Sequence, residues 1–253
     1  MDTILFDLDG TLLPMDQTVF VKRYMGELAE RFAPLGFDRQ AFQEALVAAT
    51  MAQVKNTSEH TNEEVFWQVF EERTSPDIRR QEPAFRAYYE TDYQELSRVV
   101  RPGGRAREAV DLLQKKGYQL VLATNPLFPR AAVWPRIHWA GLCPEDFVWI
   151  TTFENSRRCK PNPDYFRELL HKLGKRPEDC MMVGNDVEDD ILSSGSLGIR
   201  NYLITDFLIN RGHRDLNQWP HGSFEEFLAF AARLPEARKE PDKLPKEGRK
   251  TAC

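Results

Sequence analysis

Short apolar runs alternate with amphipathic stretches along most of the chain. Five runs have the length and composition of buried strands: residues 3–8, 118–124, 147–151, 180–184 and 200–205. Between them, residues 103–117 and 162–174 place apolar side chains at helical spacing. Strands that are apolar on both faces and alternate with helices indicate a parallel α/β sheet with right-handed crossovers. The pattern therefore predicts an α/β core.

One long segment breaks this alternation. From about residue 15 to residue 98 the chain carries no strand-like run, and its amphipathic segments are 18–32, 37–54, 61–74 and 82–100. The turn sequence RPGG at 101–104 then returns the chain to the α/β pattern. We therefore predict an α/β core from residues 1–14 and 99–233, with an all-helical insertion at 15–98. Residues 234–253 contain three prolines and mixed charge, which predicts a disordered tail.

Composition narrows the class of protein. The chain has 253 residues and 42% hydrophobic content, enough for a packed core. Its formal net charge of −5 gives no general reason to expect nucleic acid as a partner. The four cysteines form no CxxC pair and no Cys/His cluster, so no zinc site is expected. We see no secretory signal and no run of about 18 apolar residues that could cross a bilayer. We therefore expect a cytoplasmic protein without a membrane partner, and its oligomeric state cannot be read from the sequence.

Two carboxylates follow the first strand directly. Asp7 and Asp9 lie at its carboxyl end, with Gly10 and Thr11 behind them. Ligands of open α/β sheets bind at that edge, and Gly10 allows a close turn of the backbone. A turn that merely ends a strand would account for this stretch taken alone.

Two further stretches carry groups that suit a phosphate. Thr124 and Asn125 end the strand at 118–124, where a hydroxyl and an amide can donate hydrogen bonds to an anionic oxygen. Lys160 lies in the loop before the helix at 162–174 and can reach a phosphate as a point charge. Each has an ordinary interpretation, as a strand-ending turn or as a surface lysine.

A fourth stretch supplies more acidic groups. The strand at 180–184 ends at Gly184 and is followed by Asn185 and Asp186. Asp189 and Asp190 come next, at the start of a helical segment, where carboxylates also favour the helix dipole.

The four stretches together resemble the motifs of the haloacid dehalogenase superfamily. They match as DLDGT at 7–11, ATN at 123–125, CKP at 159–161 and VGNDVEDD at 183–190, and the resemblance covers residues 1–14 and about 99–206. It implies a Rossmann-like parallel sheet core and identifies the helical insertion as a type 1 cap. One position departs from the family pattern, because Asn185 stands where an Asp usually follows the glycine.

The resemblance also implies roles for these residues. Asp7 would be the nucleophile and Asp9 the general acid and base. Thr124, Asn125 and Lys160 would hold the phosphoryl group, together with the turn at Gly10 and Thr11. Mg²⁺ would lie among Asp7, Asp9 and the pair Asn185 and Asp186; we favour Asp186 at the metal, with Asn185 nearby. Asp190 would orient Lys160.

The expected activity follows from the same resemblance. A phosphate ester carries a charge of about −1.5 to −2, so an attacking carboxylate needs positive charge nearby, which Mg²⁺ and Lys160 would supply. We therefore expect a magnesium-dependent phosphatase that acts on a small phosphorylated metabolite through an aspartyl-phosphate. The presence of Asp9 favours phosphoryl transfer over halide displacement. A phosphomutase, or a catalytically silent binding protein on this fold, is the alternative.

Overall fold

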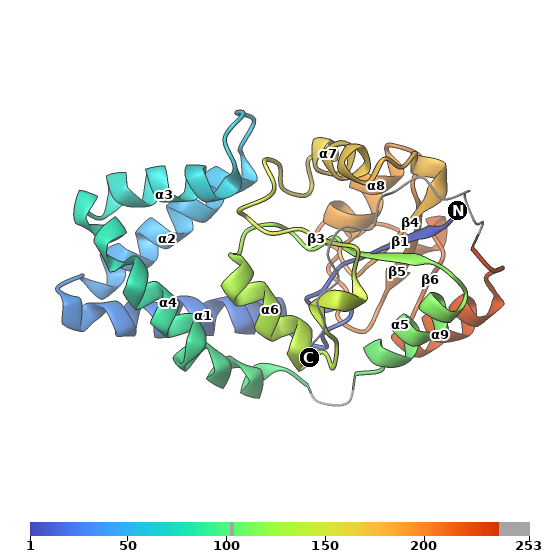
Figure 1. Ribbon diagram of the computed structural model, residues 1–253, viewed down its shortest axis with the longest axis horizontal. Coiled ribbons are helices and arrows are strands. Elements are labelled where there is room, and N and C mark those ends of the chain that lie inside the picture. Colours follow the sequence, from blue (N-terminus) through green and yellow to red (C-terminus); the bar gives the residue numbers. More distant parts are fainter. Residues whose placement is uncertain (102–103, 238–253) are drawn as a thin grey trace.

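A computed structural model describes residues 1–101 and 104–237 (Figure 1). Its six strands form one parallel sheet in the order β3-β2-β1-β4-β5-β6. They are β1 (Thr3–Phe6), β2 (Gln119–Leu122), β3 (Trp149–Ile150), β4 (Cys180–Gly184), β5 (Arg200–Ile204) and β6 (His221–Gly222). The predicted α/β class with a Rossmann-like parallel sheet is confirmed.

Helices cover both faces of the sheet. They are α5 (Ala106–Lys115), α6 (Arg130–Trp139), α7 (Pro163–Leu173), α8 (Ser193–Gly195) and α9 (Phe224–Arg233). Side chains alternate across β1 as in any strand. Phe6 packs edge-on against Phe227 of α9, at 5.8 Å between ring centroids, whereas Leu5 belongs to the cluster formed with α7 on the other face. Because β1 is buried on both faces, its carboxyl end is held rigidly.

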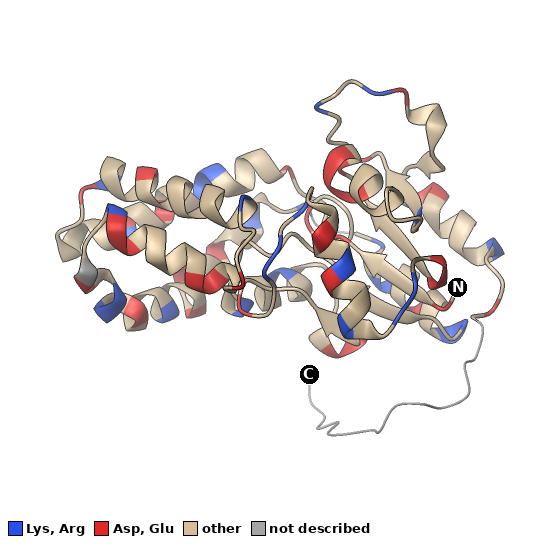
Figure 2. Ribbon diagram, turned by 90° about the horizontal axis from the view of Figure 1, so that it is seen from above, with Lys and Arg blue, Asp and Glu red and all other residues tan. Residues whose placement is uncertain are grey.

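The inserted helical domain follows β1 and lies to one side of the sheet (Figure 1). Its helices are α1 (Gln17–Phe32), α2 (Arg39–Val54), α3 (Asn62–Arg73) and α4 (Glu82–Glu90). Side chains of Asp16, Asp38 and Thr61 cap the first three of them. The predicted helix at 82–100 is divided, because α4 ends at Glu90 and a 3-10 segment, η3 (Asp92–Val99), follows. Basic and acidic residues are interspersed over this domain (Figure 2).

The interior of the insertion is aromatic. Phe32 stacks on Phe42 at 5.0 Å between centroids, and Phe42 meets Phe70 at 5.3 Å. All three side chains are at most 1% exposed. The helical spacing of these rings therefore reflects a packed core.

Several short elements were not predicted. The strand β6 and the helices α6 and α9 are among them, and α6 contains Pro135 in its interior, a residue that usually ends a helix. Other short helical turns are η1 (Ala33–Leu35), η2 (Pro76–Gln81), η4 (Pro144–Asp146), η5 (Pro177–Asp179), the π-helical η6 (Val187–Leu192) and η7 (Leu216–Gln218). No described helix is long and apolar enough to span a membrane.

The start of the predicted tail is attached to the core. Ala237 donates a backbone hydrogen bond to Lys116 at 2.8 Å, and the Tyr118 hydroxyl donates to the Pro235 carbonyl at 2.9 Å. The rest of the tail, 238–253, lies outside the described residues.

Candidate active site

The carboxyl ends of three neighbouring strands carry the predicted polar residues. Asp7 follows β1, Thr124 follows β2 and Asn185 follows β4, and β1 lies between the other two. A cavity of about 640 Å³ opens at this edge, and α1 and α2 of the insertion form its other wall. Of the predicted site residues, those that line it are Asp7, Asp9, Thr124, Asn125, Lys160, Asp186 and Asp190. The position matches the usual ligand site of open α/β sheets.

Lys160 joins two carboxylates at the base of this cavity. Its Nζ atom lies 3.0 Å from Asp7 Oδ1 and 2.6 Å from Asp190 Oδ1, and its side chain is 1% exposed. Burial by itself would lower the pKa of Lys160, but Asp190 and Asp7 raise it well above the ordinary value. Burial raises the pKa of Asp7, and the Lys160 ammonium opposes that shift. Lys160 is therefore a buried cation at the predicted nucleophile, as the role of phosphate ligand requires.

The Thr11 hydroxyl links Asn185 to Asp7. The Thr11 hydroxyl is 3.1 Å from Asn185 Oδ1 and 3.4 Å from Asp7 Oδ2, while Asn185 Nδ2 donates to the Phe207 carbonyl at 2.6 Å. The amide oxygen of Asn185 is thus turned toward the Thr11 hydroxyl, which also contacts Asp7. Gly10 has a φ of +86°, and a Cβ there would lie 2.4 Å from Asn185 Nδ2, so only glycine fits this turn.

Asp186 is turned to different partners. Its Oδ1 accepts the backbone N–H groups of Glu188 and Asp189, which caps η6. Arg211 contacts both of its carboxylate oxygens, at 3.0 and 2.9 Å. Burial raises the pKa of Asp186 to about 6. The structure therefore places Asn185 against Thr11, which also contacts Asp7, whereas the favoured Asp186 lines the cavity and is bound to η6 and Arg211.

Asp9 is held by an arginine that sequence reasoning missed. Arg136 of α6 is fully buried and forms an ion pair with Asp9 Oδ2, and its guanidinium lies 4.3 Å from the ring centroid of Phe128. Gln17 of α1 donates to the Asp9 backbone carbonyl. Burial raises the pKa of Asp9, and Arg136 opposes that shift. Arg136 lies in no recognisable motif, and Pro135 beside it conceals the helix that carries it.

Thr124 and Asn125 differ in their surroundings. The Thr124 carbonyl accepts hydrogen bonds from Thr151 Oγ1 at 2.7 Å and from the Tyr165 hydroxyl at 3.1 Å, which fixes the end of β2. The Asn125 amide exchanges two hydrogen bonds with the Lys160 backbone, at 3.2 and 3.3 Å. The contacts of Asn125 therefore position the Lys160 loop.

The oxygen atoms around Asp7 suit a hard divalent cation. The Asp7 carboxylate, the Asp9 backbone carbonyl and the Asn185 amide oxygen are the donor types that Mg²⁺ prefers. Asp9 Oδ1 is buried and has no hydrogen-bond partner among the described residues. Within residues 1–101 and 104–237, no group of three or more His, Cys, Asp or Glu side chains is arranged to hold a metal. A cation here would therefore depend on amide and backbone oxygens as well as carboxylates.

Comparisons with known proteins place the chain in a family. Pyrophosphatase PpaX of Halalkalibacterium halodurans is 24% identical over 204 residues, 81% of this chain and 83% of that protein. Ribulose-1,5-bisphosphate 5-phosphatase of Halopiger xanaduensis is 28% identical over 210 residues, 79% of this chain and 83% of that protein. The crystal structure of a HAD phosphatase from Thermococcus onnurineus shares the fold, with a TM-score of 0.56, 19% identity and coverage of 91% of this chain and 97% of that one.

The family model for haloacid dehalogenase-like hydrolases matches residues 1–198, which include the four motifs and the inserted helical domain. This chain therefore belongs to the haloacid dehalogenase-like hydrolase family.

Proposed function

We propose that the chain is a magnesium-dependent phosphatase that hydrolyses a small phosphorylated metabolite through an aspartyl-phosphate on Asp7. The observation that carries the proposal is the Asp7 carboxylate at the base of the cavity, with the buried Lys160 ammonium 3.0 Å away. Two relatives named as phosphatases support the same chemistry, and the match with this chain covers more than four-fifths of each of them.

Each site residue has its own role in the proposed reaction. Asp7 attacks the phosphorus atom, and the bond from phosphorus to the leaving oxygen breaks as Asp9 gives that oxygen a proton. Asp9 then accepts a proton from a water molecule that attacks the aspartyl-phosphate, releasing phosphate and restoring Asp7. Lys160 and Thr124 hold the charged phosphoryl oxygens. Asp190 keeps the Lys160 ammonium in place.

We assign the metal to the oxygen atoms of Asp7, the Asp9 backbone and Asn185. When bound, Mg²⁺ would reduce the repulsion between the carboxylate and the phosphate. The contacts of Asp186 with η6 and Arg211 support a structural role for that side chain.

The proposal is tested by phosphate release, with Mg²⁺ and with EDTA, from p-nitrophenyl phosphate, sugar phosphates and inorganic pyrophosphate. Pyrophosphate belongs in the panel because one relative is a pyrophosphatase. We expect magnesium-dependent release that Asp7→Asn abolishes. Asp2→Asn is the matched control, since Asp2 lies just before the other end of β1 and pairs with Lys175 at 2.7 Å. Release that survives in Asp7→Asn would exclude Asp7 as the nucleophile.

The metal assignment has its own test. Asn185→Ala should weaken Mg²⁺ binding, measured by calorimetry, by at least about tenfold. Asp186→Ala should mainly cost stability, about 1 kcal/mol, because it removes a helix cap. The opposite pattern would move the metal site to Asp186.

A further inference from the structure

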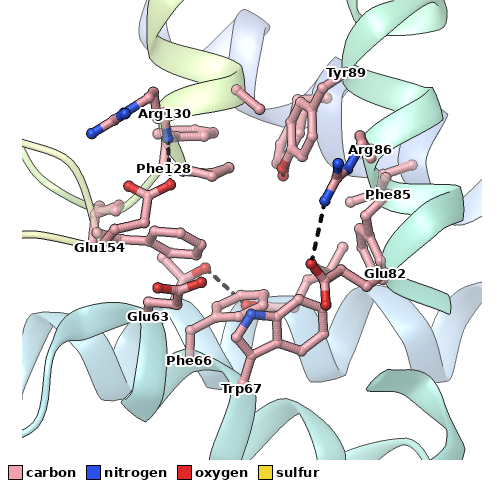
Figure 3. Close-up of a pocket in the computed structure, with 18 of the residues that line it drawn as sticks. Glu63, Phe66, Trp67, Glu82, Phe85, Arg86, Tyr89, Phe128, Arg130 and Glu154 are labelled. Carbon is pink, nitrogen blue, oxygen red and sulfur yellow. Dashed lines mark hydrogen bonds and ion pairs between the residues drawn. The ribbon is translucent and has the colours of Figure 1, made fainter. Parts of the chain in front are cut away.

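The helical insertion contains a second cavity of about 630 Å³, here called the cap chamber (Figure 3). Side chains from α1, α2, α3 and α4 line it, and residues 127–131 and 153–154 of the core close it. Its volume falls within the range of about 300–1,000 Å³ that is usual for small-molecule sites. The predicted function does not account for it.

Aromatic rings form much of the chamber wall. Phe66 and Trp67 come from α3, Phe85 and Tyr89 come from α4, and Phe128 comes from the loop after β2 (Figure 3). The rings support one another: Trp67 meets Phe66 at 5.6 Å and Phe85 at 5.4 Å between centroids, both edge-on. The chamber is therefore preformed, and its rings offer an apolar surface to a ligand, although the Arg79 guanidinium already lies 5.0 Å from the ring centroid of Trp67.

Two carboxylates lie on one side of the chamber, across from Tyr89 (Figure 3). Glu154 Oε1 accepts the backbone N–H of Arg130 at 2.8 Å, whereas its Oε2 is buried without a hydrogen-bond partner in the described part of the chain. Burial raises the pKa of Glu63, and the nearby Glu154 raises it further. A positive group of a ligand placed here would relieve both effects.

The charge of Arg79 opposes the rise in the pKa of Glu63, but the arginines that line the chamber form no ion pair with Glu63 or Glu154. Arg79 is paired with Glu71, and Arg86 lies 3.8 Å from Glu82. The guanidinium of Arg130 points away from the chamber (Figure 3). Within residues 1–101 and 104–237, neither Glu63 nor Glu154 forms an ion pair. The chamber is therefore mostly apolar, with two carboxyl groups at one side that form no ion pair in the described part of the chain.

The chamber adjoins the candidate active site. Val21 of α1, together with Leu127 and Phe128, lines both cavities. We propose that the cap chamber binds the apolar, amine-bearing end of the substrate, while the phosphoryl group of the same molecule lies at Asp7. This assignment rests on the proposed phosphatase function, and it restricts the substrate to a phosphate ester with an apolar, cationic body.

Binding can be tested without any phosphate chemistry. We would titrate primary alkylamines of increasing chain length into the protein by calorimetry, each beside the alcohol of the same length. Amines should bind more tightly than alcohols, and Glu154→Gln should weaken the amines about tenfold while leaving the alcohols unchanged. Glu72→Gln, an exposed change on α3, is the matched control and should alter neither. Equal binding of amines and alcohols, or no effect of Glu154→Gln, would overturn the proposal.

Kinetics then links the chamber to the reaction. We would compare phosphate release from ω-aminoalkyl monophosphates with release from alkyl monophosphates of matched length. The amino esters should have about tenfold higher kcat/KM, and Glu154→Gln should remove that preference through KM. Equal kcat/KM in the two series would overturn the chamber assignment and leave the phosphatase function standing. Amine binding without phosphate release from any ester would refute the phosphatase function, and the substrate assignment with it.

Discussion

Removal of the Lys160 ammonium should destabilise the whole fold as well as the site. Nζ lies 2.6 Å from Asp190 Oδ1 and 3.0 Å from Asp7 Oδ1, in a side chain that is 1% exposed. At an effective dielectric constant of about 20, each contact is worth about 5–6 kcal/mol before desolvation. Lys160→Met leaves two carboxylates buried without their cation. Because breaking a buried ion pair costs about 3–5 kcal/mol, we expect a loss of that size in the free energy of unfolding.

A second variant and a control separate this effect from simple loss of a lysine. The double variant Lys160→Met with Asp190→Asn removes one uncompensated charge together with the cation, so its cost should be smaller than the sum of the single costs. Lys175→Met is the control, because Lys175 pairs with a single carboxylate, that of Asp2 at 2.7 Å, and the two side chains are 12% and 13% exposed. It should reduce the free energy of unfolding less than Lys160→Met, because only one carboxylate loses its partner and water can reach it.

Urea denaturation at neutral pH, followed by circular dichroism, measures each free energy of unfolding. A loss of unfolding free energy in Lys160→Met no larger than that in Lys175→Met would refute this expectation, and so would simple additivity of the two single losses in the double variant.

Three further predictions concern the packing around the site. A Cβ at Gly184 would lie 2.1 Å from Asp190 Oδ2, so Gly184→Ala should lower the free energy of unfolding, measured with urea, by about 1–3 kcal/mol. Gly26→Ala is the control, in an open helical position, and should raise that free energy by about 0.5–1 kcal/mol. Arg136→Met leaves the Asp9 carboxylate buried without its cation and should reduce the free energy of unfolding by about 3–5 kcal/mol. A melting temperature close to that of the wild type would contradict this. Burial raises the pKa of Tyr24 to about 12, against about 10 in an unfolded chain, so the unfolded state loses this proton first. Stability should therefore be unaffected by this group below about pH 10 and fall between about pH 10 and 12, and Tyr24→Phe should reduce that fall in urea titrations across this range.

The residues that end the strands could be predicted because their signal is local. An apolar run that stops at a polar residue marks a strand end, and parallel strands place those ends at one edge. Asp7 and Thr124 were found in this way and Lys160 from its loop before a predicted helix, and the structure brings all three to one cavity.

Other contacts of the site could not be predicted because they join elements that are distant in sequence. Arg136 reaches Asp9 across 127 positions, from a helix that its neighbouring proline conceals. Arg211 meets Asp186 from a loop after β5 and carries no motif. The cap chamber could not be predicted either, because it depends on how four helices pack. Aromatic residues at helical spacing line the chamber, but aromatic residues at the same spacing also form the closed core around Phe42.

The sequence by itself determined the fold class, the inserted helical domain and the edge of the sheet where the polar residues gather, because each follows from the periodicity of short segments. Tertiary structure alone distinguished the surroundings of Asn185 from those of Asp186. Successive residues after a strand point in different directions, so which of them reaches Thr11 depends on the pairing of β1 with β4, where Phe6 lies opposite Val183. That pairing brings the Asn185 amide to the Thr11 hydroxyl and leaves Asp186 to cap a helix.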